Sequence, residues 1–248
     1  NLPAISLQYP CNLPESSLQS PCTLVKASYV VQVNRFLAEA ARERGGDGAA
    51  DDLIFCQLER QLHDVEPRTL RRTDRAFKVK FVGEASDDYG GPYRETITYL
   101  CAELQSQASP LLVVSPNGQS NVGNNRSSWL VKPSASSAAQ MRGFTFLGKL
   151  VGCALLQSQC QLDLELCPHV WKRLAAIGLD ETDLASFDEA QANSLRWMRR
   201  CDETDGIDAD SFGDIIFDAF ETTLSDGTNA ELIDEGRTTD VTFETRHR

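Results

Sequence analysis

The sequence predicts an α+β protein that is mainly α-helical. Apolar residues recur at the three- to four-residue spacing of an amphipathic helix in several long segments, whereas strict alternation of apolar and other residues is confined to the short segment 77–82. With 248 residues, 41% of them hydrophobic, the chain can enclose a substantial core in one large domain or two small ones. Helices with small antiparallel pieces between them define the α+β class.

The first part of the chain reads as an irregular lead-in followed by a helical preamble. Residues 1–26 contain four prolines and show no helical or strand period, so we expect little regular structure there. The preamble, 27–75, is predicted to contain two helices. The first covers 27–44 and ends at the glycine-rich residues 45–48. Its apolar stripe comprises Val30, Val33, Leu37 and Ala41.

The second helix of the preamble is predicted to start near Asp51 and Asp52, because carboxylates are favourable at the positive N-terminal end of a helix. Its apolar face comprises Ile54, Leu58 and Leu62. The alternating segment 77–82 then predicts a strand. Its two lysines would face water, and its core face comprises Phe77, Val79 and Phe81.

A helix is predicted over 93–105, because Pro92 suits the first turn, where a missing N–H costs nothing. Its buried face comprises Tyr93, Ile97, Leu100 and Leu104. The segment 115–140 is rich in Ser, Asn, Gly and Pro, and we expect long loops there with one small strand at 129–131.

Three further helices are predicted in the second half of the chain. The strongly apolar helix 141–156 carries Gly148 and Gly152 one turn apart, which we expect to let another element approach closely. The helix 168–177 is expected to turn Val170, Trp171 and Leu174 inward. A capping box at 186–189 (S-x-x-E) opens a helix that runs to about Cys201. The remainder alternates acidic turns with short apolar runs.

No self-contained active site, metal site or cofactor site emerges from the motifs. The eight cysteines include no C-x-x-C pair, a pattern typical of reduced thiols in a cytoplasmic or nuclear protein. Cys153, Cys160 and Cys167 are followed by His169 but lack the close ligand pairs of zinc sites. The acidic segment 202–210 lacks the first and twelfth ligands of a calcium loop. The glycine pair at 90–91 matches no phosphate-binding motif.

The composition argues against nucleic-acid and membrane partners. The net charge is -12, and no basic stripe overrides this average. The longest apolar stretch, 144–156, is shorter than the roughly 20 residues that cross a bilayer. The first residues do not form a signal peptide, and because the chain starts with Asn rather than Met we expect it to be a fragment.

The helix predicted up to Cys201 and the segment that follows it carry more apolar side chains than so short and polar a region needs for itself. Apolar anchors ringed by charge favour a protein-docking site. Alternatively, the same residues form a small core. The residues concerned are Leu195, Met198, Phe212, Ile215, Ile216 and Phe217.

Six ordered blocks resemble the N-terminal lobe (N-lobe) of a HECT-type E3 ubiquitin ligase. The blocks are 77–84 (FKVKFVGE) with 88–95 (DYGGPYRE), 144–152 (FTFLGKLVG), 162–164 (LDL), 171–172 (WK), 194–196 (SLR), and 231–242 (ELIDEGRTTDVT). Their wording, together with 116–118 (PNG), is most similar to the giant HERC-like HECT ligases that also carry RCC1-like repeats.

The resemblance implies that 76–248 is a partial N-lobe, with a small subdomain at about 187–230 that binds a ubiquitin-conjugating enzyme (E2). Ser194, Leu195 and Met198 would form one wall of the E2 groove. The segment 212–216, with Phe212, Ile215 and Ile216, would form another. The ligase would pass ubiquitin from the E2 to a cysteine on a separate C-lobe and then to a substrate lysine, so its partners are E2, ubiquitin and a protein substrate.

The resemblance also implies that the catalytic cysteine and the C-lobe are absent from this chain. Thr245 and Arg246 stand where the family shows an Asn-Arg pair followed by an aromatic residue, and Thr242 resembles the N-cap of a helix that is cut within its first turns. The fragment alone is therefore expected to be inactive. The alternative is a non-catalytic, HECT-derived interaction scaffold. The sequence does not identify the E2, the substrate or the type of ubiquitin chain.

Overall fold

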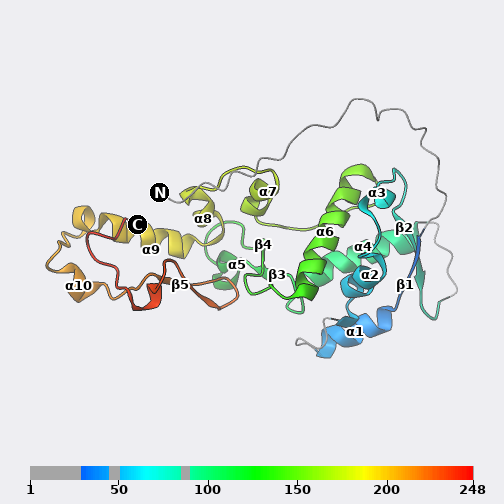
Figure 1. The fold of residues 1–248 in the computed structure, drawn as a ribbon, viewed down its shortest axis with the longest axis horizontal. Coiled ribbons are helices and arrows are strands. Elements are labelled where there is room, and N and C mark those ends of the chain that lie inside the picture. The colour runs from blue at the N-terminus through cyan, green and yellow to red at the C-terminus, as the bar shows by residue number, and fades with distance from the viewer. Residues whose placement is uncertain (1–28, 45–50, 85–89, 248) are drawn as a thin grey trace, which may run out of the picture.

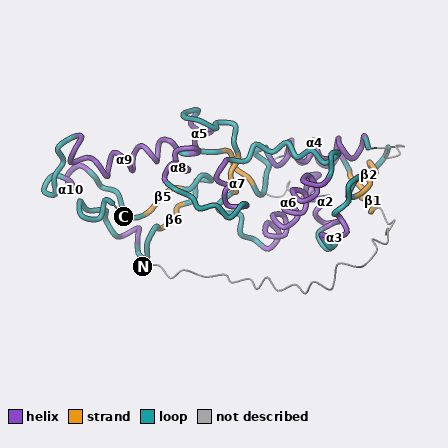
Figure 2. Tube along the Cα trace, turned by 90° about the horizontal axis from the view of Figure 1, so that it is seen from above, coloured by secondary structure: helices purple, strands orange, loops and turns teal. Residues whose placement is uncertain are grey.

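The computed structural model describes residues 29–44, 51–84 and 90–247, which form an elongated molecule (Figure 1). One end is a large subdomain built from β1 to α4 with α6, and the other end is a small subdomain built from α9, α10 and the β5–β6 hairpin. The elements β3, β4, α5, α7 and α8 lie between the two ends, as a second view also shows (Figure 2). The predicted lead-in 1–26 and the glycine-rich residues 45–48 lie outside the described residues.

Helices dominate, as predicted, and the sheets are small. The helices are α1 (Arg35–Arg44), α2 (Ile54–Leu62), α3 (Pro67–Leu70), α4 (Gly91–Leu104), α5 (Pro116–Ser120), α6 (Ala138–Leu156), α7 (Pro168–Leu174), α8 (Glu181–Phe187), α9 (Glu189–Thr204), α10 (Phe212–Ile215) and the 3-10 helix η3 (Gly236–Thr238). The strands are β1 (Tyr29–Val33), β2 (Phe77–Phe81), β3 (Leu112–Val114), β4 (Trp129–Val131), β5 (Glu221–Thr223) and β6 (Asn229–Glu231).

The prediction of a helix starting at residue 27 is wrong at its described beginning, because Tyr29–Val33 is a strand. This strand, β1, pairs in parallel with β2 from Tyr29 opposite Phe77 to Val33 opposite Phe81. Its β-branched valines favour a strand, and Val31 and Val33 are buried. The helix α1 starts only after Asn34, whose side-chain Oδ1 accepts a hydrogen bond from the Leu37 N–H at 3.1 Å.

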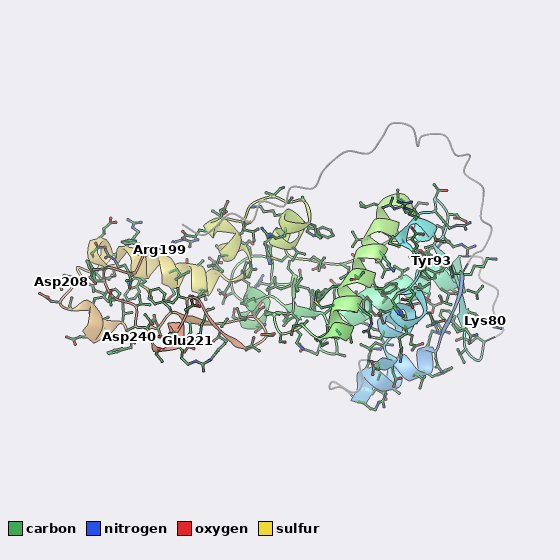
Figure 3. All side chains as sticks on the ribbon, viewed as in Figure 1. Lys80, Tyr93, Arg199, Asp208, Glu221 and Asp240 are labelled. Atoms are coloured by element: carbon green, nitrogen blue, oxygen red, sulfur yellow. The ribbon has the colours of Figure 1, made fainter. Side chains whose placement is uncertain are left out.

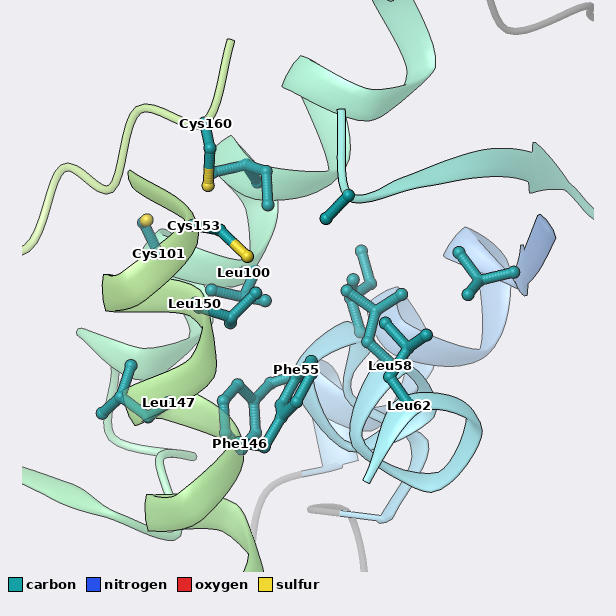
Figure 4. Close-up of a cluster of buried hydrophobic side chains, with 14 of the residues drawn as sticks. Phe55, Leu58, Leu62, Leu100, Cys101, Phe146, Leu147, Leu150, Cys153 and Cys160 are labelled. Atoms are coloured by element: carbon teal, nitrogen blue, oxygen red, sulfur yellow. The ribbon is translucent and has the colours of Figure 1, made fainter. Parts of the chain in front are cut away.

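The core of the large subdomain forms between α2, α4, α6 and the β1–β2 pair (Figure 4). The predicted strand at 77–82 and the predicted helix faces of α2 and α4 are confirmed, since every residue placed on these faces is buried. The rings of Phe55 and Phe146 lie 5.4 Å apart between α2 and α6. The rings of Phe77 and Tyr93 lie 5.0 Å apart between β2 and α4. The Phe55–Phe146 pair joins the preamble to the rest of the subdomain, and the Phe77–Tyr93 pair joins β2 to α4.

Lys149 of α6 caps the C-terminal end of α2. Its Nζ donates to the carbonyl oxygens of His63 at 2.5 Å and Val65 at 2.9 Å, so an ammonium group neutralises the negative end of that helix. The predicted close approach at Gly148 and Gly152 is wrong. A Cβ at either position would meet no described atom within 4 Å, because this face of α6 borders a shallow hollow beside α3.

The middle of the molecule contains the antiparallel pair β3–β4, which confirms the predicted strand at 129–131. It also contains the helix α5, which was not predicted. In α7 the inward orientation of Trp171 and Leu174 is wrong, since their exposed fractions are 44% and 65%. Among these three predicted residues, only Val170 packs against the large core. The neighbouring Lys172 pairs with Asp183 of α8 at 2.6 Å and so joins the two short helices.

The capping box predicted at 186–189 is also displaced. Ser186 belongs to the last turn of α8, and Asp188 caps α9 by accepting a hydrogen bond from the Gln191 N–H at 3.0 Å. A capping box does occur one helix earlier, at Asp180 and Asp183 of α8. The helix α9 then carries the chain from the middle of the molecule into the small subdomain (Figure 1).

Candidate docking surface

The small subdomain is held together by five buried apolar side chains from α9, α10 and the turn between them. These are Met198, Cys201, Ile207, Phe212 and Ile216. Val241 and Phe243 pack against them from the last part of the chain, with the rings of Phe212 and Phe243 edge to face at 5.8 Å. The turn is closed by hydrogen bonds from the Ile207 N–H to the Cys201 carbonyl and from the Phe212 N–H to the Asp208 carbonyl.

The six residues predicted to bind E2 divide between this core and the surface. Met198, Phe212 and Ile216 are core residues with exposed fractions of 8%, 1% and 7%. Ser194 is exposed and Leu195 is partly buried on α9. Ile215 is 48% exposed. Three of the six therefore belong to a small core, which was the alternative to a docking site, and the other three are accessible.

Phe217, which follows α10, is 81% exposed, the most exposed aromatic side chain of the small subdomain among the described residues. Its neighbour Ile216 is buried, because the chain leaves α10 in an extended conformation that turns successive side chains to opposite sides. Helical spacing alone would not distinguish the buried Ile216 from the exposed Phe217. The signal in the sequence is the aspartate on either side of the run 215–217, which places this run at the surface.

Two hollows adjoin the small core. One, of about 440 Å³, lies between α9 and the β5–β6 hairpin and is lined by Ser194, Leu195 and Met198 together with Phe220 and Ile233. The other, of about 430 Å³, lies between α10 and residues 240–244 and is lined by Phe212, Ile216 and Phe217. Val241 lines both. The two predicted walls thus border neighbouring hollows on either side of one core.

The β5–β6 hairpin is fixed to the segment that follows it. The Phe220 N–H donates to the Thr239 carbonyl at 3.1 Å, and the Leu232 N–H donates to the Phe220 carbonyl at 2.8 Å. Gly236 is required where the chain returns, because a Cβ there would lie 2.3 Å from the Phe220 carbonyl oxygen. This glycine belongs to the 231–242 block of the sequence, so the block has a structural reason to contain it.

Arg246 closes the small subdomain against α9. Its Nη2 lies 2.8 Å from the Asp202 Oδ2, and its guanidinium stacks 3.6 Å from the centroid of the Phe243 ring. Thr242, expected to cap a helix, is followed by turns up to residue 247. Its N–H donates to the Thr245 Oγ1 at 2.9 Å, and the Thr245 N–H donates to the Thr242 carbonyl at 3.0 Å.

The surface of the small subdomain is strongly acidic. Fourteen of the 36 acidic residues of the chain, but one of its 24 basic residues, lie in 202–244. This segment therefore carries a formal charge of -13, whereas the rest of the chain is close to neutral. Figure 3 shows Asp208, Glu221 and Asp240 distributed over the small subdomain, at the opposite end of the molecule from Lys80.

The described thiols are poor nucleophiles because they are buried or partly buried. Cys101, Cys153, Cys160, Cys167 and Cys201 are buried, and Cys56 is partly buried. Burial raises the pKa of the Cys56 thiol to about 12 and the pKa of the Cys101 and Cys153 thiols to about 11. Burial also raises the pKa of Cys160 and Cys167.

No group of three or more His, Cys, Asp or Glu side chains within 29–44, 51–84 and 90–247 is arranged to hold a metal ion. In these same ranges, none of the helices combines the length and the apolar character that a membrane crossing needs. The described residues also include accessible apolar side chains beside the small core.

Comparison with known proteins identifies the class. The profile of the HECT domain (ubiquitin-transferase) matches residues 98–248, and the chain belongs to this family. The first of the blocks recognised in the sequence, 77–95, lies entirely before the matched region. The mainly helical α+β structure agrees with an N-lobe, so the identification made from the ordered blocks is confirmed.

Among individual proteins, the chain is 38% identical over 172 residues to the E3 ubiquitin-protein ligase HERC2 of Homo sapiens, a match that covers 68% of this chain and 4% of the relative. It is 30% identical over 169 residues to the probable E3 ubiquitin-protein ligase HECTD4 of Homo sapiens, covering 65% of this chain and 4% of the relative. It is 32% identical over 164 residues to the E3 ubiquitin-protein ligase HECW1 of Homo sapiens, covering 66% and 9%. The chain thus spans a small part of the length of these relatives.

Proposed function

We propose that this chain is the E2-docking lobe of a HECT E3 ubiquitin ligase. In the whole ligase, ubiquitin would pass from the E2 to a cysteine of a separate C-lobe and then to a substrate lysine. The observation that carries the proposal is the set of accessible apolar side chains, Leu195, Ile215 and Phe217, mounted around a core of five buried residues. Such anchors beside hollows are what a protein partner uses to gain binding energy.

Buried neighbours make the surface suitable for docking. Because Met198, Phe212 and Ile216 are fixed in the core, the backbone that carries Leu195, Ile215 and Phe217 is held in one conformation. An E2 would then bind without first having to order this segment. The hollow beside Phe217 and the hollow beside Leu195 give it two neighbouring sockets.

The positions of the thiols support the assignment of the chemical step to another part of the ligase. A thiol that accepts ubiquitin must be accessible and must ionise near neutral pH, since the thiolate is the nucleophile. The six described cysteines are buried or partly buried, and burial raises the pKa of five of them. The described part of the chain would then dock the E2 without accepting its ubiquitin.

The test is a binding measurement with ubiquitin-conjugating enzymes. A panel of E2 enzymes is titrated by calorimetry against the chain and two matched variants, Phe217→Ala and Phe36→Ala. Both phenylalanines are exposed, with exposed fractions of 81% and 68%, but Phe36 lies on α1 in the large subdomain. The proposal predicts that at least one E2 binds, that Phe217→Ala weakens its binding about tenfold or more, and that Phe36→Ala leaves it unchanged. Absence of binding across the panel, or equal losses in both variants, would contradict the proposal.

A further inference from the structure

The carboxylates of the small subdomain differ in whether they have an ion-pair or hydrogen-bond partner. Three of them pair with arginine: Asp202 with Arg246, Glu203 with Arg200 and Glu221 with Arg237. Four more accept hydrogen bonds from side chains within the subdomain or nearby: Asp205, Asp208, Asp226 and Glu244. The other seven make no side-chain hydrogen bond or ion pair with any described residue, and all seven are exposed: Asp210, Asp214, Asp218, Glu231, Asp234, Glu235 and Asp240.

Three of these carboxylates lie on the two chain segments that border the exposed Phe217. Asp214 and Asp218 lie on either side of the run that ends in Phe217. Asp240 lines the same hollow as Phe217, and it is brought there by the bridge between Ala219 and Asp240. The Val241 N–H donates to the Asp218 carbonyl at 2.8 Å, which holds the two aspartate-bearing segments side by side. Phe217, which is 81% exposed, therefore lies in an acidic patch formed by Asp214, Asp218 and Asp240, whose carboxylates pair with no described side chain. Asp240 lines the hollow beside Phe217, and Asp218 lines the neighbouring hollow beside Leu195.

Exposed carboxylates within one patch repel one another. Arg199 and Arg246 line the hollow with Asp218, but they are paired with Glu181 and Asp202. Only Arg237 lies among the fourteen acidic residues of 202–244, and it is already paired with Glu221. A partner that brings lysine or arginine side chains to this acidic patch would relieve the repulsion. It would also be attracted over distances of about a Debye length, roughly 10 Å at 0.1 M salt, before contact is made.

We propose that the small subdomain selects its E2 by charge: the carboxylates of Asp214, Asp218 and Asp240 steer a basic surface of the E2 onto Phe217. The inference rests on the proposed docking function and adds a rule for choosing among E2 enzymes, namely that basic docking faces are favoured and acidic ones are rejected. Discrimination arises as much from repulsion of acidic faces as from attraction of basic ones. The apolar anchor supplies binding energy that salt does not screen.

A second copy of this chain is a poorer occupant of the surface. Two copies related by a two-fold axis would bring the same acidic patch against itself, because such an interface uses the same surface on both subunits. Nucleic acid is repelled by the same charge. A protein with a basic face around an apolar socket remains the occupant that the chemistry fits.

The experiment measures association rates by stopped flow with E2 enzymes that range from acidic to basic. The chain is compared with the triple variant Asp214→Asn, Asp218→Asn, Asp240→Asn. A matched triple variant changes the net charge equally through exposed carboxylates elsewhere: Glu39→Gln, Glu43→Gln, Glu165→Gln. Each is studied at low salt and at about 1 M salt, where the Debye length falls to roughly 3 Å.

Steering predicts that a basic E2 associates about tenfold more slowly with the aspartate triple variant than with the unchanged chain at low salt. The matched triple variant should change the rate less than about twofold, and high salt should remove the difference. If an E2 binds through Phe217 but its rate is insensitive to salt and to the aspartate triple variant, charge selection is refuted while docking stands. If the acidic members of the panel bind fastest, charge selection is likewise refuted. If no E2 binds at any salt concentration, both proposals fall.

Discussion

Two phenylalanines five positions apart allow the core and the docking surface to be separated by the same substitution. Phe212 is 1% exposed and packs edge to face on Phe243, whereas Phe217 is 81% exposed. We expect Phe212→Ala to unfold the small subdomain and Phe217→Ala to leave it folded. The comparison is clean because the side chain removed is identical in the two variants.

The magnitudes follow from burial. Removing a fully buried phenylalanine side chain costs about 3–5 kcal/mol of unfolding free energy, from lost apolar transfer and from the cavity left behind. The core that loses it contains five buried residues, so few neighbours remain to hold α10 against α9. Removing an exposed side chain is expected to change the unfolding free energy by no more than about 0.5 kcal/mol.

Hydrogen exchange of backbone amides, read by mass spectrometry, is the appropriate assay because it reports each subdomain separately. In Phe212→Ala, amides of α9 and α10 should lose protection while those of α4 and α6 keep it. In Phe217→Ala, protection should be unchanged throughout. Equal loss of protection in the two variants would refute the division into core and surface, and so would full protection of α9 and α10 in Phe212→Ala.

Three further outcomes are expected. Glu103 accepts a hydrogen bond from the Phe55 N–H, and burial raises its pKa from 4.5 to about 7. The contribution of the protonated Glu103 to the unfolding free energy is therefore fully present below about pH 4.5, and about 3 kcal/mol of it is lost as the pH rises through 7. In urea titrations, Glu103→Gln should remove this dependence of the unfolding free energy on pH. Lys149→Met should lower the unfolding free energy by about 1–2 kcal/mol in thermal unfolding, because α2 loses its cap, whereas the exposed Lys80→Met should not. Incubation with ubiquitin-loaded E2 should leave no reducible ubiquitin thioester on this chain, as non-reducing gels would show; a thioester on any of its cysteines would overturn the proposed division of labour.

The sequence predicts helices and strands best where one face of the element is buried and the other is exposed to solvent. The strand β2 alternates lysines with Phe77, Val79 and Phe81, and α4 repeats apolar residues at helical spacing, so their patterns determine their structures. The pattern is ambiguous at Tyr29–Val33, because Val30 and Val33 fit a helical stripe while Val31 and Val33 fit a strand. Pairing with β2, a long-range contact, decides between them.

The sequence predicts the composition of the candidate docking surface but not which of its side chains are exposed. Helical spacing places Leu195 and Met198 on one stripe, yet the one is partly exposed and the other buried, because the core of the small subdomain covers only the C-terminal part of that stripe. The buried state of Phe212 and Ile216 depends on Val241 and Phe243, which lie far along the chain. No local pattern contains that contact. The acidic character of 202–244, by contrast, can be read from the sequence alone.

NMR can show directly whether the small subdomain docks an E2. The isotope-labelled chain is titrated with the E2 that binds it most tightly, and backbone amide shifts are recorded along the whole chain. We expect the largest changes on α9 and α10 and on residues 240–244, around Leu195 and Phe217. Changes centred on α2 and α6 of the large subdomain, with α9 and α10 unaffected, would contradict this expectation.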